Sequence, residues 1–84
     1  MDEPAIFAKL TEIVRAMLED DTIVLSAETT ADDVAGWDSM NHIFIVVEIE
    51  RQFSIKFQTA EMEELRNVGE LVQLIGTKLA ATAT

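Results

Sequence analysis

Ser39 is the residue of this sequence that is best placed to do chemistry. It follows an acid, Asp38, at the expected first position of a helix. The first N–H groups of a helix have no partner inside the helix, and the helix dipole is positive at that end. A phosphate ester on the Ser39 hydroxyl would therefore be held well. The alternative is that Ser39 is a second capping residue beside Asp38, and the local pattern alone favours this structural role.

The sequence holds little that indicates an enzyme or a metal site. Ser39 does not lie in a G-x-S-x-G turn, and His42, three residues later, makes only a weak catalytic pair with it. The acidic run at 19–21 lacks the residue spacing of a calcium-binding loop. The sequence contains no Cys, which excludes disulfides and thiolate catalysis. We therefore expect no catalytic residue and no bound metal.

Length and charge narrow the class of protein. With 84 residues, the chain is expected to form one domain over residues 1–84. It has 16 acidic and 6 basic residues, a net charge of -10, and such a surface repels nucleic acid and anionic lipid. The longest apolar run is too short to cross a membrane, and the acidic N-terminus is unlike a signal peptide. We expect a cytoplasmic protein that binds no nucleic acid and does not span a membrane.

Hydrophobic periodicity predicts helices over residues 4–18 and 38–53. The apolar stripe of the first helix consists of Ile6, Phe7, Leu10, Ile13, Val14, Met17 and Leu18. The second helix is expected to begin with Asp38 as its N-cap, although it is rich in Val and Ile. A strand over residues 43–49 is the competing prediction. The residues near the end of this segment fit a 3.6-residue period better, and the strand would have no clear partner.

A short helix over about residues 59–65 and a fourth over about 67–80 complete the predicted fold. Thr59 is expected to cap the short helix, and Asn67 with Glu70 makes a capping-box-like start for the fourth. The buried stripe of the fourth helix is expected to be Val68, Leu71, Val72, Ile75 and Leu79. The predicted fold class is all-α, a four-helix bundle with a short third helix.

The long loop between the first two helices, residues 19–38, has no helical period. Long loops in compact domains are usually functional. Ile23 and Leu25 are expected to pin it to the core, and its later part to make a single turn. Trp37, the one Trp in the chain, is expected to close the loop on the helices as a hydrophobic anchor. Residues 80–84, at the other end of the chain, are expected to form a frayed tail.

The tripeptide D-S-M at residues 38–40, after Gly36 and Trp37, resembles the D-S-L signature of acyl carrier proteins. Met40 in place of Leu is a mild, nearly volume-conserving change. The resemblance covers nearly the whole chain, because acyl carrier proteins also have an apolar first helix, a long loop, a short third helix and an amphipathic fourth one. D-S-L alone is a weak motif, but together with size, charge and helix order it is a strong one.

The resemblance implies that Ser39 is the site where a phosphopantetheinyl transferase, using coenzyme A and Mg²⁺, attaches 4′-phosphopantetheine. Asp38 would belong to the same cofactor-binding motif. Acyl groups would be carried as thioesters on the thiol of this arm, and the apolar space between the helices would shelter them. The protein would be a non-catalytic monomer. It would serve acyl-transferring or acyl-activating enzymes with basic or apolar docking patches, in fatty acid synthesis or a specialised acyl, lipid or polyketide pathway.

Met40, Phe44 and Val47 are spaced i, i+4, i+7 and share one face of the second helix. The opposite face is expected to fill the core and consists of Ile45, Val46, Ile49 and Phe53, with Ile43 at the border. The resemblance implies that the first face, together with Glu48, is where partner enzymes dock. The alternative is that Phe44 belongs to the core.

Two other functions are compatible with these residues. A peptidyl or aminoacyl carrier domain has the same fold and a modified serine, whereas a cofactor-free acidic protein-interaction module needs no modification. The acids of the second helix are only Glu48 and Glu50, fewer than carriers of fatty acid synthesis usually have there. The flanking Trp37 and His42 look more like stand-alone carriers of specialised acyl pathways. His42 is expected to be a packed, neutral ring, with contact to the phosphate as a cation the alternative.

Overall fold

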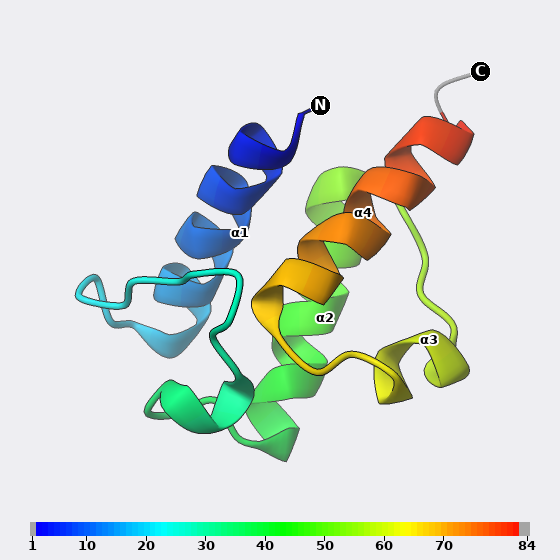
Figure 1. Cartoon of the computed structure of the whole chain (residues 1–84). Coiled ribbons are helices and arrows are strands. Elements are labelled where there is room, and N and C mark those ends of the chain that lie inside the picture. The colour runs from blue at the N-terminus through cyan, green and yellow to red at the C-terminus, as the bar shows by residue number, and fades with distance from the viewer. Residues whose placement is uncertain (1, 83–84) are drawn as a thin grey trace.

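The computed structural model describes residues 2–82 and contains helices but no strand within them. Its elements are α1 (Glu3–Leu18), the 3₁₀ turn η1 (Ala31–Asp33), α2 (Ser39–Phe53), α3 (Thr59–Glu63) and α4 (Val68–Thr82) (Figure 1). The predicted all-α class, the short third helix and the long first loop are confirmed. The competing strand prediction is wrong, because residues 43–49 lie inside α2.

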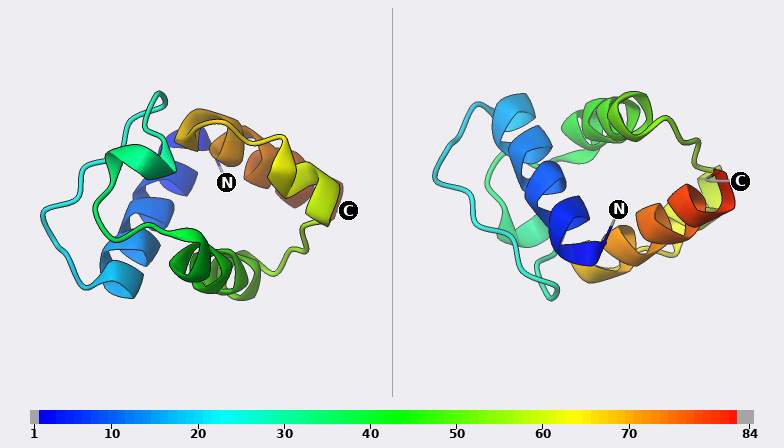
Figure 2. Two further views of the ribbon diagram at one scale, coloured as in Figure 1. Left: turned by 90° about the horizontal axis from the view of Figure 1, so that it is seen from below. Right: turned by 90° about the horizontal axis from the view of Figure 1, so that it is seen from above.

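The three long helices form the sides of the bundle. Figure 2 shows α3 on the side opposite α1, between α2 and α4. Figure 1 shows η1 and the first turn of α2 at the same end of the bundle. The residue at that start, Ser39, is thus positioned jointly by the loop and the helix.

Apolar residues from the three long helices make up the core. Those that are buried on these helices are Ile6, Leu10, Ile13, Val14, Ile45, Ile49, Phe53, Val68, Leu71, Val72 and Ile75. Burying one such side chain contributes about 1.5–3 kcal/mol. The predicted stripes are therefore confirmed at these positions. Their remaining members, Phe7, Met17, Leu18 and Leu79, are partly buried against the core, and Val46 is half-buried rather than buried.

Hydrogen bonds to α1 and α4 hold the long loop in place. The Val68 N–H donates to the carbonyl of Thr29 (2.8 Å), and the Gly69 N–H donates to the carbonyl of Ala27 (2.9 Å). These two N–H groups belong to the first turn of α4 and have no partner inside that helix. The Arg15 Nε group donates to the carbonyl of Ile23 (2.7 Å) from α1. The loop therefore supplies the capping acceptors that α4 needs.

The apolar anchors of the loop also lie where they were predicted. Ile23 and Leu25 are buried in the same core cluster as the helical residues. The single turn that was predicted in the later part of the loop is η1, and Val34, which follows it, is also buried. Burial of these side chains and the bonds to α4 act together, because each positions the backbone for the other.

The ends of α3 and α4 correct two predictions. The N-cap of α3 is Gln58, whose N–H donates to Glu61 Oε1 (2.8 Å), whereas Thr59 is the first helical residue. The predicted start of α4 is confirmed, since the Glu70 N–H donates to Asn67 Oδ1 (2.9 Å). This helix continues to Thr82, past the expected end near residue 80. Of the expected tail, residues 83 and 84 lie outside the described residues.

Ionic and aromatic contacts tether α3, which has no buried residue of its own. Lys78 of α4 pairs with Glu61 (Nζ to Oε1, 2.8 Å) and lies over the ring of Phe57, 5.9 Å from its centroid. The bonds from Lys78 and from the Gln58 N–H lower the pKa of Glu61 below its ordinary value. The attachment of α3 therefore depends on groups at its surface rather than on burial.

Two glycines of α4 test the contact between the loop and α4. A Cβ at Gly69 would lie 2.9 Å from the carbonyl oxygen of Ala27, whereas a Cβ at Gly76 would meet only Ile6 Cδ1, at 3.6 Å. Gly69→Ala is expected to destabilise the protein by about 1–3 kcal/mol, because the added methyl forces the loop away from α4. Gly76→Ala is expected to stabilise it by up to about 1 kcal/mol, through the higher helix propensity of Ala.

Urea unfolding of the two variants beside the wild type measures this difference. The urea concentration at the midpoint of unfolding is expected to be highest for Gly76→Ala, lower for the wild type and lowest for Gly69→Ala. A Gly69→Ala protein that unfolds at the wild-type midpoint or above would show that the loop does not depend on its close approach to α4.

Candidate functional site

The N-cap residue Asp38 builds the first turn of α2. Its side chain accepts a hydrogen bond from the Asn41 N–H (2.8 Å), and its backbone carbonyl accepts one from the His42 N–H (2.8 Å). Asp38 has extended backbone, with φ -99° and ψ -178°, and Ser39 is the first helical residue. The predicted cap and the predicted place of Ser39 are both confirmed.

A second contact fixes the chain just ahead of the helix, and sequence reasoning missed it. The Asn41 Nδ2 group donates to the carbonyl of Gly36 (2.7 Å). Gly36 has a φ of 89°, a left-handed conformation that Gly adopts without strain. The available signal was a Gly five residues before an Asn in the first helical turn, which is too common to predict a bond. Asn41 therefore links the turn before α2 to the helix itself.

Trp37 anchors this turn to the core and contacts His42. Trp37 is only 9% exposed, which confirms the predicted anchor. Its indole Nε1–H donates to His42 Nδ1 (3.0 Å), and the two rings stack with centroids 6.2 Å apart and planes 26° apart. Because Nδ1 accepts this bond, the imidazole in this arrangement is neutral and carries its proton on Nε2. The packed, neutral ring predicted for His42 matches this geometry.

The Ser39 side chain lies on the outside of this turn. It is exposed, and within residues 2–82 its hydroxyl has no hydrogen-bond partner. The capping bond to Asn41 is made by Asp38, so the structural role that competed for Ser39 is already filled. A free hydroxyl at the positive end of a helix is open to modification, and a phosphate placed there is stabilised by the helix dipole.

The two other serines have different surroundings. The Ser26 hydroxyl lies 3.1 Å from Thr29 Oγ1 in a turn of the long loop. Ser54 is the C-cap of α2, with a left-handed φ of 57°. A phosphate at a helix C-terminus meets the negative end of the dipole and is disfavoured. Neither residue offers the electrostatic setting of Ser39.

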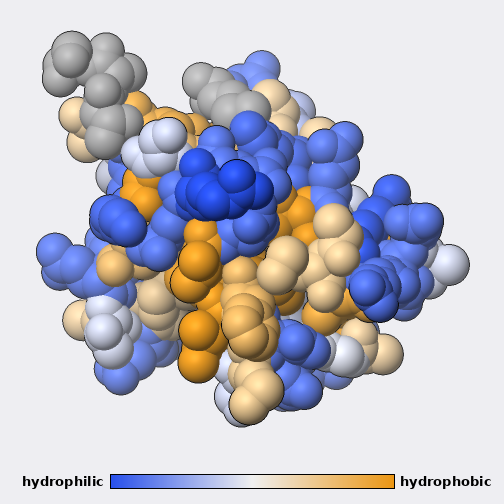
Figure 3. Space-filling model, turned by 180° about the vertical axis from the view of Figure 1, so that it is seen from behind, coloured by the Kyte–Doolittle hydropathy of each residue, from blue (hydrophilic) through white to orange (hydrophobic). Residues whose placement is uncertain are grey.

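A row of exposed apolar side chains, which we call the apolar strip, follows Ser39 along α2. It consists of Met40 (69% exposed), Ile43 (62%), Phe44 (54%) and Val47 (54%). Figure 3 shows apolar side chains gathered in the middle of this face of the molecule. The predicted exposure of Met40, Phe44 and Val47 is confirmed, and the alternative that Phe44 belongs to the core is wrong. Ile43, which was predicted at the border of the buried face, is instead 62% exposed and belongs to the apolar strip.

The two acids of α2 are engaged within the protein. The Glu48 carboxylate accepts hydrogen bonds from Arg51 and from Gln52 Nε2 (2.9 Å), and these bonds, with that from Arg51 the larger cause, lower its pKa. The Glu50 carboxylate accepts a bond from the Phe57 N–H (2.8 Å). The exposed face of α2 is therefore mainly apolar, because the carboxylates of Glu48 and Glu50 are already hydrogen-bonded within the protein.

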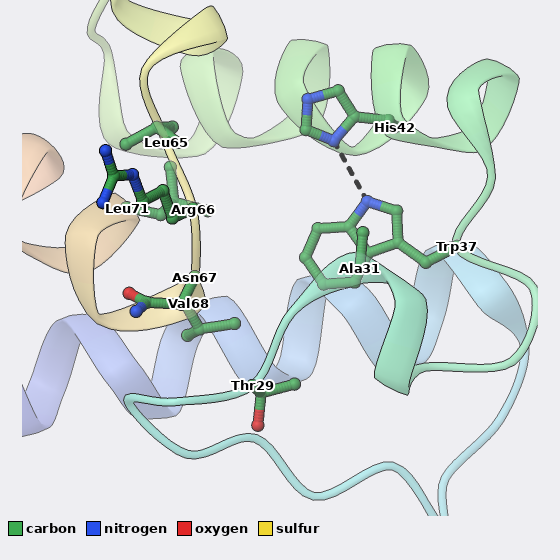
Figure 4. Close-up of a pocket in the computed structure, with 9 residues that line it drawn as sticks. All are labelled: Thr29, Ala31, Trp37, His42, Leu65, Arg66, Asn67, Val68 and Leu71. Atoms are coloured by element: carbon green, nitrogen blue, oxygen red, sulfur yellow. Dashed lines mark hydrogen bonds between the residues drawn. The ribbon is translucent and has the colours of Figure 1, made fainter.

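A small hollow lies beside the first turn of α2, with a volume of about 90 Å³. Its lining comes from the long loop, the start of α2 and the segment that leads into α4, and consists of Thr29, Ala31, Trp37, His42, Leu65, Arg66, Asn67, Val68 and Leu71 (Figure 4). Figure 4 shows the polar ends of Arg66, Asn67 and Thr29 turned away from the rings of Trp37 and His42. The surface of this hollow is therefore mainly apolar.

The part of the chain that the structure describes has neither a cluster of metal-ligating side chains nor a helix that could span a membrane. Within residues 2–82, no three His, Cys, Asp or Glu side chains are grouped so that they would hold a metal ion. None of the helices there is both long enough and apolar enough to cross a bilayer.

Comparison with known proteins identifies the family. Residues 8–75 match the family described as "Phosphopantetheine attachment site". The acyl carrier protein of Thermotoga maritima is 31% identical over 74 residues, which cover 88% of this chain and 91% of that protein. The acyl carrier protein of Streptococcus pyogenes serotype M1 is 36% identical over 74 residues, 88% of this chain and 96% of that protein.

A solved structure agrees with these sequence relatives. The solution structure of the holo acyl carrier protein from Geobacter metallireducens superposes with a TM-score of 0.88 at 41% identity, covering 93% of this chain and 90% of that one. The likeness therefore extends over the loop and all the helices described above, and not only over a short motif. The chain belongs to the acyl carrier protein family, the phosphopantetheine-attachment family whose prosthetic group is 4′-phosphopantetheine.

Proposed function

We propose that this protein carries acyl groups as thioesters on a 4′-phosphopantetheine arm attached to the Ser39 hydroxyl. The observation that carries the proposal is the combination of an exposed, unpartnered hydroxyl and a first helical position. Asp38 already caps the helix, so Ser39 is free for modification without loss of a structural bond. When bound, the arm supplies the thiol that the chain, which has no Cys, lacks.

The residues around Ser39 have separate parts in this function. Asp38 and Asn41 hold the first turn of α2 in one shape, so the arm is attached to a fixed point. The unpaired N–H groups of that turn stabilise the phosphate, because they lie at the positive end of the helix. A phosphopantetheinyl transferase performs the chemistry, and Ser39 needs no base of its own.

The remaining parts of the proposed role are those that are typical of acyl carrier proteins. Residues 1–84 form one carrier domain that acts as a cytoplasmic monomer and catalyses no reaction itself. Its partners are the transferase and the acyl-transferring or acyl-activating enzymes of fatty acid synthesis or a specialised acyl, lipid or polyketide pathway. The acyl role is favoured over the peptidyl one because the relatives compared above are named acyl carrier proteins.

Replacing Ser39 tests the attachment site. The wild type, incubated with coenzyme A, Mg²⁺ and a phosphopantetheinyl transferase, is expected to gain the mass of one phosphopantetheine, measured by intact-protein mass spectrometry. Ser39→Ala is expected to keep the wild-type fold and gain no mass, because the attacking hydroxyl is gone. Ser26→Ala serves as the control and is expected to be modified like the wild type. Modification of Ser39→Ala, or a wild type that gains no mass, would contradict the proposal.

The apolar strip beside Ser39 is proposed as the docking face for partner enzymes. Large apolar side chains exposed side by side are typical of interaction sites, and aromatic residues are common anchors in them. Met40, Phe44 and Val47 provide this surface, and Glu48 lies next to it with its carboxylate bound to Arg51. Partners should therefore recognise this face mainly through apolar contact, with less help from ion pairs.

Replacing Phe44 separates docking from stability. Phe44→Ala is expected to change the free energy of unfolding by less than about 1 kcal/mol, because the ring is half exposed. It is expected to lower kcat/KM for a partner enzyme about tenfold, the effect of losing one interface anchor. Phe53→Ala is the matched control on the buried face and should cost about 3–5 kcal/mol of stability. A stability loss of that size in Phe44→Ala, or unchanged kcat/KM, would remove Phe44 from the docking face.

A further inference from the structure

We propose that His42 is a positioning residue for the loading of Ser39 with phosphopantetheine, and that it acts only while its imidazole is neutral. The inference rests on the proposed function of Ser39 and makes that function depend on pH. Trp37 precedes Ser39 by two residues and His42 follows it by three, so the bond between the two rings spans the attachment site. His42 acts on the Ser39 hydroxyl through Trp37 and the backbone between them.

The bond from Trp37 requires a neutral imidazole. The indole Nε1–H donates to His42 Nδ1 at 3.0 Å, so Nδ1 must keep its lone pair free. A second proton on the ring takes this lone pair and leaves two N–H donors facing each other. The imidazole lies at the N–H edge of the indole, which is the positive edge of the aromatic system, so a cation there gains no cation–π attraction. Protonation of His42 therefore breaks the bond.

The other side chains around the indole do not replace this acceptor. Figure 4 shows the polar ends of Thr29 and Asn67 turned away from the Trp37 ring. Asn67 Oδ1 also already accepts the N–H of Glu70 (2.9 Å). Trp37 is only 9% exposed, and a buried donor without a partner is costly. The indole is therefore expected to leave its buried position more often once the bond to His42 is broken.

Loss of this bond loosens the segment that leads into Ser39. Two bonds hold that segment against the first turn of α2, the one from Trp37 and the one from Asn41 Nδ2 to the carbonyl of Gly36 (2.7 Å). The amide of Asn41 does not titrate, so only the bond from Trp37 depends on pH. With one of the two bonds gone, the ordered conformer that the transferase binds is populated less. A smaller competent population raises the apparent dissociation constant in proportion, so the effect should appear in KM rather than in kcat.

His42 is well suited to be the pH-dependent group. Histidine is the side chain that ordinarily titrates between about pH 5 and pH 8, and the chain has one His and no Cys. The charged groups on the segments packed around it are Asp38, Arg66, and Asp32 and Asp33 of η1. Figure 4 shows the charged end of Arg66 turned away from the imidazole. Carboxylates and guanidinium groups ordinarily keep their charges over this pH range, so the charge that changes belongs to the imidazole.

Loading of the wild type and of His42→Asn at several pH values tests the inference. Coenzyme A, Mg²⁺ and a phosphopantetheinyl transferase are used, and kcat and KM are measured for the carrier. The Asn amide oxygen can accept the indole bond but does not titrate. From about pH 8 to about pH 5.5, wild-type kcat/KM divided by that of His42→Asn is expected to fall about fivefold, mainly through KM. The ratio cancels the pH dependence of the transferase itself.

The indole N–H resonance of Trp37 provides a readout without the transferase. In the wild type it is expected to shift with a single-proton titration over the same pH range, and to stay nearly fixed in His42→Asn. A constant kcat/KM ratio, or an indole resonance that shifts alike in both proteins, would overturn the inference. A wild type that gains no phosphopantetheine at any pH would overturn the proposed function and the inference together, whereas normal loading with a constant ratio overturns only the inference.

Two further variants complete the test. His42→Leu offers no acceptor at any pH, and its KM is expected to be raised at about pH 8 as that of the wild type is at about pH 5.5. Loading of His42→Leu with the wild-type KM at the higher pH would contradict the role of the bond. Gln73→Ala, an exposed change on α4, is the control and should keep the wild-type pH profile. If His42→Asn does not fold, His42→Gln supplies the acceptor that does not titrate.

Discussion

Burial of Trp37 is the interaction on which the functional end of this protein depends. It anchors the last residues of the long loop in the core and so determines where α2 begins. Asp38 then caps the helix, and Ser39 follows on its outer side. The bond from the indole to His42 ties the same anchor to the first helical turn. One buried aromatic thus positions Ser39, the proposed attachment site, and also forms a wall of the hollow beside the first turn of α2.

The small size of the core accounts for the second functional feature. In a domain of this length, α1, α2 and α4 enclose a single layer of apolar side chains, and α2 can bury only one of its two apolar faces. Ile45, Ile49 and Phe53 fill the core, which leaves the apolar strip in solvent. The apolar strip that we propose as the docking face thereby lies next to the proposed attachment point. The carboxylates of Glu48 and Glu50 are bound within the protein and leave that face mainly apolar.

Periodicity predicted the features that depend on one helix, and missed those that depend on contacts between segments. The stripes of α1 and α4, the cap at Asp38 and the exposure of Phe44 all follow from the spacing of residues along a helix. The bonds from Asn41 to Gly36 and from Trp37 to His42 depend on how the loop returns to the helix, which no local pattern encodes. The orientation of Ile43 depends in the same way on how α2 rotates against its neighbours.

The most direct test of the account compares the backbone amide resonances of the protein before and after modification. The first turn of α2 is already formed and capped by Asp38, and we propose that the arm is attached there without rearranging the core. The largest shifts should then occur over residues 38–42, with those of Ile45 and Ile49 nearly unchanged. Shifts centred on Ser26 or Ser54, or spread through the core of α1 and α4, would contradict it.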